Sequence, residues 1–388
     1  TIVNAQRRIQ RRTNMEAALR YLTGCSDTVA NVAKQIGVTR PAAESIVSDL
    51  VKLGWVEDMP APEGVIAMGR PATYYKLSSQ AGHVLSLDIG AHHVSALTAD
   101  LSGHILAENT EDLAENTPTK TRIAAALAVS KKTLEDTKCG KTWVCVTGSP
   151  GVQYQGKVAY FGGKGMPGWQ GLQLDQVLSE ELGVKVTTVG DCALGARGES
   201  WVGAAAKRND VVFILAGIRT GAASVLDGRV RAGSRGAAGL IGEIPQLRWR
   251  ELEAESFAKS IYTPNQPPDR ETMFRQAREG NKLAIAGAAK FGEILGLGTA
   301  SMIAVIDPEC VVLGGQFCEY ADLFLPQMEQ TIRKLCPFAP SIVVSTLGRR
   351  AVALGGIRYA LDGVWDRIRV HALNSDYFPA ADSDKFWL

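Results

Sequence analysis

Histidine is scarce in this 388-residue sequence, which has only five, so a Cys/His zinc cluster has almost nothing from which to be built. The seven cysteines are odd in number and scattered, with no CxxC pair and no regular spacing. This usage argues against a disulfide framework and predicts reduced thiols in the core. We therefore expect no metal site.

Long apolar runs are missing too. No stretch of 18 consecutive apolar residues occurs, and the arginine-rich N-terminus leads into no signal-type apolar segment with a small-residue cleavage site. We expect a cytoplasmic protein with no membrane partner. The composition, 46% hydrophobic and 21% charged, is typical of a globular chain of two or three domains and excludes global disorder.

Net charge is only +2, but it is unevenly distributed. Residues 1–77 carry ten lysines and arginines against seven acids, and Arg7, Arg8, Arg11 and Arg12 stand together at the start. Such a run is usually a solvated arm. A contact with nucleic acid is the alternative, and the pattern that follows the arm favours it.

Up to about residue 56, apolar residues recur with helical spacing and predict three short amphipathic helices, the third capped by Thr39. Residues 60–77 combine prolines and glycines with a strand-like run, which is a hairpin signal. This order of helix, turn, helix and hairpin is typical of a winged helix-turn-helix. In that motif the helix after the turn enters the major groove of DNA.

We therefore predict that this segment binds double-stranded DNA. Arg40 can pair with guanine or a phosphate, and Glu44 can accept from cytosine. A three-helix protein-interaction module is the alternative, because it packs by the same logic. The candidate DNA-binding residues are Arg11, Arg12, Thr39, Arg40, Glu44, Ser45, Ser48 and Arg70.

From Val84 onward, apolar strands alternate with helical patterns, which predicts an α/β region that binds ligands at the carboxyl ends of its strands. A weak echo between the two halves is compatible with two related lobes. The expected strands are 84–90, 143–151, 186–191, 211–217, 310–315 and 342–348, and the expected helices are 121–136, 172–182 and 282–305.

The first of these strands ends in Asp88-Ile89-Gly90. A strand that ends in Asp-x-Gly brings a carboxylate and backbone amides towards phosphates in actin-like sugar kinases, although an ordinary hairpin turn has the same sequence. His92 and His93 follow after Ala91. Adjacent residues on a strand point to opposite faces, so this pair argues against a metal site.

The chain resembles the ROK family of repressors, open reading frames and kinases, and in particular its repressors with an N-terminal winged helix. The resemblance rests on TRPAAESIVSDLVKLGWV, GRPATYYKL, LDIG, TGSPGVQYQGKV, MPGWQG, VGDCALGARGESWVGAA, SVLDGRVRAGSRGAAGLIGEI and IDPECVVLGGQ. It implies an α/β fold: a winged helix (1–80, with a basic N-terminal arm) before a two-lobed actin-like, ribonuclease-H-like domain of the sugar-kinase type. The lobes are expected at 81–192 and 193–388, the second ending in a helical tail.

The departures from the family's kinases bear on function. Kinases carry Asn-Asp-Ala-Asn, whose Asp is the general base, where this chain reads Gly190-Asp191-Cys192-Ala193. Their Gly-Thr-Gly phosphate loop aligns with Gly217-Ile218-Arg219, where a bulky cation hinders close backbone approach. The first phosphate turn is altered as well. We therefore expect no enzyme activity and no cofactor. Asp191 matches the position of the kinases' general base, but we do not expect it to be catalytic.

The sugar and zinc segment has also changed. The family's Ala-Gly-Glu-Ile-Gly-His becomes residues 238–243, which end in Glu243, and the zinc loop is deleted. Glu253 stands where the last sugar-contacting Glu belongs, although it could be a solvated helix carboxylate. Glu243, Arg248 and Arg250 could build a new cleft floor for an anionic ligand, or the arginines could lie on the surface. The candidate effector-binding residues are Asp191, Glu243 and Glu253.

The sequence thus predicts a transcriptional regulator, most plainly a repressor, that binds an operator as a homodimer or homotetramer. A sugar or sugar phosphate in the cleft would alter its DNA affinity, and linkage requires operator and effector to weaken each other equally. Two alternatives remain open: a sugar kinase with a DNA-binding appendage, and a regulator of the same fold that senses no small molecule.

Overall fold

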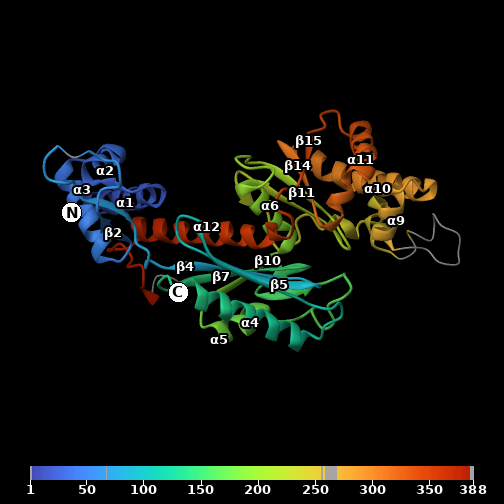
Figure 1. Ribbon diagram of the computed structural model, residues 1–388, viewed down its shortest axis with the longest axis horizontal. Helices are drawn as coiled ribbons and strands as arrows, with labels where there is room; N and C mark the ends of the chain where they lie inside the picture. Colours follow the sequence, from blue (N-terminus) through green and yellow to red (C-terminus); the bar gives the residue numbers. More distant parts are fainter. Residues whose placement is uncertain (1, 67, 255–256, 258–268, 385–388) are drawn as a thin grey trace.

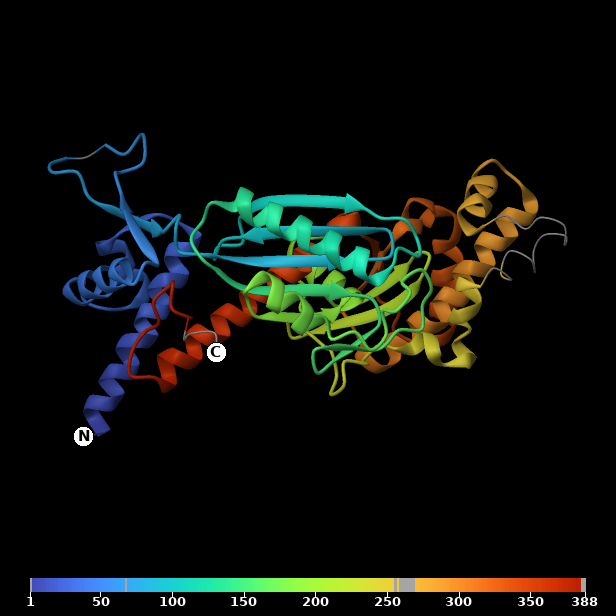
Figure 2. The same ribbon diagram turned by 90° about the horizontal axis from the view of Figure 1, so that it is seen from below.

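The computed structural model describes residues 2–66, 68–254, 257 and 269–384. The molecule is elongated, with a helical N-terminal part at one end, a first sheet at the centre and a second sheet with its helices at the other end (Figure 1). A view from below shows that a loop of the N-terminal part projects away from the body (Figure 2).

The N-terminal part is a winged helix, as predicted. It contains helices α1 (Ile2–Gly24), α2 (Val29–Ile36) and α3 (Arg40–Lys52) and strands β1 (Asp27–Thr28), β2 (Val56–Met59) and β3 (Tyr74–Leu77), in the sheet order β1-β3-β2. Threonine hydroxyls cap α2 and α3, because Thr28 accepts from the Asn31 amide and Thr39 from the Ala42 amide. The loop between β2 and β3 is the wing.

The expected basic arm needs a correction, because residues 2–24 form one continuous helix. Its second half buries Met15, Leu19 and Leu22, and this packing anchors a helix that extends towards the N-terminus. Arginine and glutamine, which have good helix propensity, fill much of the exposed first half. The arginine cluster is therefore held on a rigid element.

The first sheet has the order β10-β7-β4-β5-β6. Its strands are β4 (His83–Ile89), β5 (His93–Ala99), β6 (Ile105–Asp112), β7 (Thr142–Ser149) and β10 (Val186–Gly190). Successive residues of β4 alternate between faces: Leu85 and Leu87 belong to the core under α4 (Thr119–Thr137) and α5 (Leu174–Leu182), whereas the Ser86 hydroxyl donates to the Ala353 carbonyl on the other face.

The second sheet has the order β13-β12-β11-β14-β15. Its strands are β11 (Val211–Ala216), β12 (Thr220–Leu226), β13 (Arg229–Val230), β14 (Cys310–Gly314) and β15 (Ser341–Val344). Helices α9 (Arg270–Arg278), α10 (Lys282–Ile306) and α11 (Ala321–Leu335) share a core with one face, and α6 (Asp191–Val202) packs on the other. All six expected strands and three expected helices are confirmed.

Helix α10 is long and apolar enough to cross a membrane by length and composition alone, with 56% of its most apolar window buried. It packs against α11, α9 and β11, and its Phe291 and Ile294 are fully buried in the second core. The apolar character of α10 thus has a structural explanation within the fold.

The last helix, α12 (Ala351–Asn374), does not stay with the second sheet that precedes it along the chain. It packs on the first sheet through β4 and β7, on α6, and on α1 of the winged helix. The boundary expected at residue 193 therefore assigns to the second lobe a helix that lies on the first. Glycines allow its closest contact, because a side chain at Gly355 would collide with the Leu194 carbonyl of α6.

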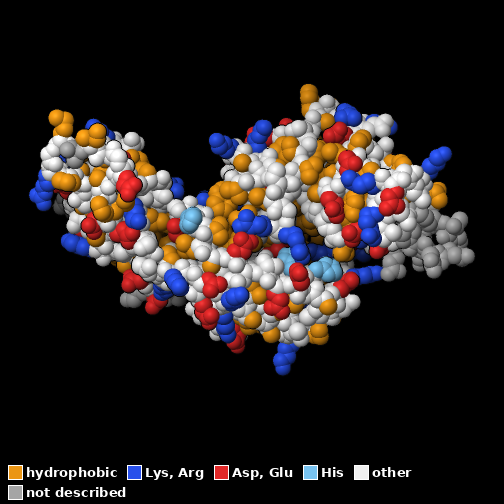
Figure 3. Space-filling view, viewed as in Figure 1, with side chains coloured by type: hydrophobic (Ala, Val, Ile, Leu, Met, Phe, Trp, Pro, Cys, Tyr) orange, Lys and Arg blue, Asp and Glu red, His pale blue; other side chains and the backbone are white. Residues whose placement is uncertain are grey.

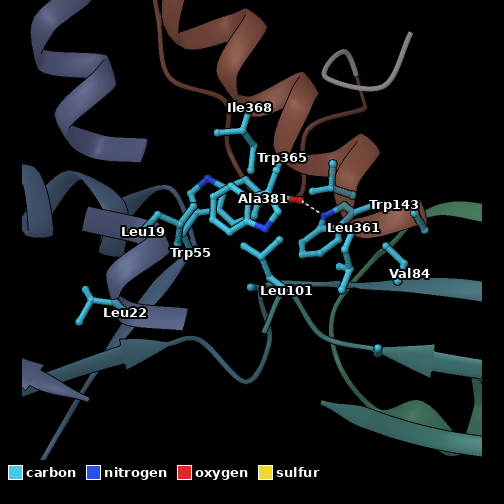
Figure 4. Close-up of a cluster of buried hydrophobic side chains, with 14 of the residues drawn as sticks. Leu19, Leu22, Trp55, Val84, Leu101, Trp143, Leu361, Trp365, Ile368 and Ala381 are labelled. Atoms are coloured by element: carbon cyan, nitrogen blue, oxygen red, sulfur yellow. Dashed lines mark hydrogen bonds between the residues drawn. The ribbon is translucent and has the colours of Figure 1, made fainter. Parts of the chain in front are cut away.

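One apolar cluster joins the winged helix to the first sheet (Figure 4). The rings of Trp55 and Trp143 lie 5.5 Å apart between centroids, and both are almost fully buried. The segment after α12 runs alongside both indoles: Trp55 Nε1 donates to the Pro379 carbonyl over 2.7 Å, and Trp143 Nε1 donates to the Ala381 carbonyl over 2.8 Å. The winged helix thus has no core separate from the rest of the chain.

Because Trp55 is buried in this shared cluster, Trp55→Ala should lower the free energy of unfolding by about 3–5 kcal/mol, through lost burial and an unfilled cavity. Urea denaturation followed by circular dichroism measures this. Phe338→Ala is the control, since Phe338 is 86% exposed, and it should change stability by less than about 0.5 kcal/mol. A loss below about 1 kcal/mol for Trp55→Ala would contradict the shared core.

Candidate functional site

A cavity of about 260 Å³ lies between the two sheets and takes its walls from both lobes. Asp191, Glu243 and Glu253 all line it, so the fold brings the three predicted effector-binding carboxylates together. Acidic and basic side chains both gather along the junction of the lobes in the space-filling view (Figure 3). The cavity is therefore polar and charged rather than purely apolar.

Asp191 is the first residue of α6, directly after β10. Its Oδ1 accepts from the Cys192 amide at the helix N-terminus, and its Oδ2 accepts from Arg219 Nη2 over 2.8 Å. The exposed fractions of the Arg219 and Asp191 side chains are 25% and 18%. The carboxylate that matches the kinase base is thus neutralised by an arginine of the altered phosphate loop.

The loop Gly217-Ile218-Arg219 is also hydrogen-bonded to helix α9. Arg270 of α9 donates from Nη1 to the Gly217 carbonyl over 3.2 Å and from Nη2 to the Ile218 carbonyl over 2.8 Å. Burial lowers the pKa of Arg270, while the negative charges of Glu253 and Asp269 act to raise it. Two carbonyls of this loop are therefore committed to a cation of the chain itself.

Glu253 ends the short helix α7 (Trp249–Glu253). Its Oε1 accepts from the Thr220 amide at the start of β12 over 2.6 Å. Burial raises the pKa of Glu253, while the Thr220 amide and the Arg219 charge act in the opposite direction. Glu253 is thus a half-buried wall of the cavity and not a solvated helix residue.

Glu243 closes a short 3₁₀ turn and forms an ion pair with Arg250. The pKa of the neighbouring Tyr160, which ends β9 (Lys157–Tyr160), is raised by burial and by Glu243. Arg250 lines the cavity, but Arg248 does not and instead pairs with Glu251 on the surface. Of the three residues expected to form a new cavity floor, Glu243 and Arg250 line the cavity and Arg248 does not.

The carboxylate of the Asp-x-Gly turn in the first lobe, Asp88, is likewise bound by a side chain of the protein itself. His93 Nε2 donates to Asp88 Oδ2 over 2.8 Å, and the Asp88 side chain is only 5% exposed. This hydrogen bond raises the pKa of His93, while burial opposes the rise. His92 lies in the turn and not on the strand, which begins at His93. Across the described ranges, no group of three or more His, Cys, Asp or Glu side chains could hold a metal ion.

Sequence reasoning missed two other cavity residues, Gln153 of β8 (Val152–Tyr154) and Thr220. Gln153 Oε1 and Thr220 Oγ1 are buried without a hydrogen-bond partner among the described residues. Gln153 lies within the TGSPGVQYQGKV motif and Thr220 directly follows Gly217-Ile218-Arg219, but nothing in these runs distinguishes either residue from its neighbours. Their role follows only from their position in the cavity wall.

The candidate DNA-binding residues fall into two groups. Thr39, Glu44, Ser48 and Arg70 are exposed, and so is Arg40, whose side chain is 72% exposed in a pair with Glu44. These residues lie on α3, at its cap and in the wing, where Ile66 and Met68 are also exposed. They present one polar helix and one projecting loop at the end of the molecule farthest from the second sheet (Figures 1 and 2).

The second group, Arg11, Arg12 and Ser45, bonds to other parts of the chain, although Ser45 is exposed and the Arg11 side chain is 39% exposed. Arg11 Nη2 donates to Ser45 Oγ and to Asp49 Oδ2, both over 2.8 Å, so two candidates bind each other between α1 and α3. Arg12 is only 8% exposed, and its Nε donates to the Ala372 carbonyl of α12 over 2.9 Å. Arg12 is therefore corrected from a candidate DNA contact to a contact between α1 and α12.

Comparison with known proteins agrees with this geometry. The ROK family model matches residues 84–361. The xylose repressor of Caldicellulosiruptor bescii is 21% identical over 363 residues, covering 84% of this chain and 89% of that protein.

Among solved structures, a ROK family transcriptional regulator, a homolog of E. coli MLC protein, has a TM-score of 0.68 and 18% identity, and covers 94% of this chain and 99% of its own. The ROK hexokinase from Thermus thermophilus has a TM-score of 0.62 and 22% identity, and covers 73% of this chain and 99% of its own. The regulator's fold thus extends over more of this chain than the hexokinase's does.

The His93–Asp88 pair predicts a pH dependence of stability. Because the folded pKa of His93 lies above its unfolded value of about 6.5, the pair stabilises fully below that pH and progressively less as the pH rises through the folded pKa. Urea denaturation from pH 6 to pH 9 should show this loss in the parent chain and not in His93→Gln. His92→Gln is the control and should keep the parent's slope, whereas equal slopes in parent and His93→Gln would contradict the assignment.

Proposed function

The chain belongs to the ROK family, and from that premise we propose that it is a DNA-binding transcriptional repressor controlled by a sugar or sugar phosphate in the cavity between its lobes. It acts in the cytoplasm as a homodimer or homotetramer, with the exposed residues of α3 and the wing against DNA. The observation that carries the proposal is helix α12, which contacts both the cavity's helix α6 and the winged helix's α1.

The middle of α12 is tied to elements that line the cavity, through Asp362 and Asp366. Arg197 of α6 pairs with Asp362 of α12 over 3.1 Å, and Asp362 also pairs with Arg358. Arg229 of β13 holds Asp366 through two hydrogen bonds of 2.8 and 3.0 Å. Arg231, two residues further along the chain, lines the cavity. A ligand that moves α6 or this hairpin therefore acts directly on α12.

The part of α12 from Trp365 onward is tied to the winged helix. Glu16 of α1, with a side chain only 6% exposed, accepts from Arg369 Nε over 3.3 Å. The Arg20 guanidinium lies 4.1 Å from the centre of the Trp365 ring, and Arg12 donates to the Ala372 carbonyl. The geometry supports one route by which a movement at the cavity changes the orientation of the DNA-binding surface.

The same geometry favours a regulator over a kinase. A general base needs a free carboxylate within reach of the sugar hydroxyl, and Asp191 is paired with Arg219. A phosphate loop needs backbone amides that a phosphate can approach closely, and here Arg219 takes the place of the loop's second glycine, with its side chain paired to Asp191. We infer that the chain uses the cavity to sense a ligand and not to transfer phosphate.

DNA binding is tested on duplexes that the full-length chain selects from a random-sequence library. Arg40→Ala should weaken binding by about 1–3 kcal/mol on the preferred sequence if Arg40 reads guanine, and equally on all sequences if it meets only phosphate. Arg333→Ala is a matched control, because Arg333 pairs with Glu329 as Arg40 pairs with Glu44, but on α11. Failure to select any sequence would sink the repressor assignment.

The coupling is tested at Glu16, which bonds Arg20 on its own helix and Arg369 on α12. Glu16→Gln removes the shared charge, so the factor by which effector weakens DNA binding should shrink from about 5–150-fold towards one. Fluorescence anisotropy of labelled duplex, with and without sugar, measures this factor. Asp112→Asn, which breaks the exposed pair with Arg349, should leave it unchanged. An unaltered factor in Glu16→Gln would rule out this route.

A further inference from the structure

Two polar atoms in the cavity wall lack the partners that buried polar atoms normally have. Gln153 is only 9% exposed, and its Oε1 bonds to no described residue; the same holds for the buried Thr220 Oγ1. Among the described residues a third such atom, Arg122 Nε, belongs to α4 and lies outside the cavity lining. Leaving such groups unpaired costs about 1–3 kcal/mol each, so a cavity that concentrates them is built for a partner.

The Gln153 amide is fixed in one orientation. Its Nε2 donates to the Pro150 carbonyl over 3.0 Å and to Ser149 Oγ over 3.2 Å. Ser149 Oγ in turn donates to the Pro150 carbonyl and accepts from Trp169 Nε1. A flipped amide would set its oxygen against the Pro150 carbonyl, which only accepts. The Oε1 acceptor is therefore held in place before any ligand arrives.

Thr220 is fixed in a similar way, by its backbone. Its amide donates to Glu253 Oε1 over 2.6 Å, which positions the first residue of β12 against α7. The hydroxyl is left to donate or accept. Thr220 and Glu253 together thus place one hydroxyl and one carboxylate side by side in the cavity wall.

The charges of the cavity restrict what this wall can bind. Of its three carboxylates, Asp191 is paired with Arg219 and Glu243 with Arg250. The lining arginine that no described carboxylate neutralises, Arg231, is exposed. Among the described residues, the unmet buried groups of this wall are thus Gln153 Oε1 and the Thr220 hydroxyl, beside the Glu253 carboxylate. A phosphate or carboxylate on this wall would meet acceptors, and, apart from the exposed Arg231, the lining arginines Arg219 and Arg250 are already paired.

We propose that Gln153 and Thr220 are the specificity-determining residues of the cavity and that they select an uncharged, hydroxyl-rich sugar over a sugar phosphate or sugar acid. The proposal rests on the sensing function proposed above and narrows its ligand. The ligand's hydroxyls donate to Gln153 Oε1 and Glu253 and exchange a hydrogen bond with Thr220 Oγ1. The Asp191–Arg219 pair stays closed, so it leaves no free charge of either sign for a ligand.

Isothermal titration calorimetry of the full chain tests this with D-xylose, D-glucose, N-acetyl-D-glucosamine, D-glucose 6-phosphate and D-glucuronate. We expect one uncharged sugar to bind at least tenfold more tightly than both anions. Thr220→Val and Gln153→Leu should each weaken that sugar by about tenfold to a hundredfold, because each removes a buried hydrogen-bonding group. Thr220→Ser, which keeps the hydroxyl, should restore most of the affinity.

Thr299→Val is the matched control, since the Thr299 hydroxyl is buried in α10 and bonds to its own helix at the Leu295 carbonyl. It should bind like the parent, and circular dichroism melting establishes that each variant is folded. Tightest binding of an anion, or parent-like binding by both folded cavity variants, overturns the selection by Gln153 and Thr220 while leaving a sensor. A chain that selects DNA but binds no sugar in the panel overturns both this proposal and the sensing function.

Discussion

The burial of Trp55 against Trp143 and the segment after α12 is the interaction on which the rest of the architecture depends. Each indole N–H donates to a carbonyl of that segment, and the Ala381 amide donates back to the Leu53 carbonyl over 2.9 Å. Both indoles thus bury large apolar area with their polar atoms satisfied, which makes the junction specific as well as apolar. Because the junction is packed and hydrogen-bonded on both sides, the coupling proposed for α12 does not have to cross an unpacked linker.

Ion pairing inside the cavity gives a second constraint. The family resemblance draws attention to lost motifs, but the structure replaces them with new interactions: Arg219 binds Asp191, Arg270 binds the loop carbonyls, and His93 binds Asp88. Of these, the Asp191 and Asp88 pairs occupy carboxylates that phosphate transfer would need to keep free. The cavity remains open and polar, which is the combination that a ligand sensor requires.

Much of this fold could be predicted from the sequence, and the limits have physical causes. Strands such as 84–90 and helices such as 282–305 follow from local periodicity, and the family motifs order them. The burial of Arg12 could not be predicted, because its partner, Ala372, lies 360 residues away. Gln153 was missed for a related reason: an unpaired amide oxygen is a property of the packed wall and leaves no mark in a run of residues.

The shared cluster also sets the order in which the protein can be completed on the ribosome. Trp55 leaves the ribosome well before Ala381, which lies 326 residues further along the chain, so at about 5–20 residues per second the tryptophan waits roughly 15–65 s for its partner segment. During that interval the apolar faces of α1 and α3 lack their final cover. A chain cut short before residue 379 never supplies the carbonyls that Trp55 and Trp143 bind. Full packing of the winged helix therefore requires a chain made at least as far as Ala381.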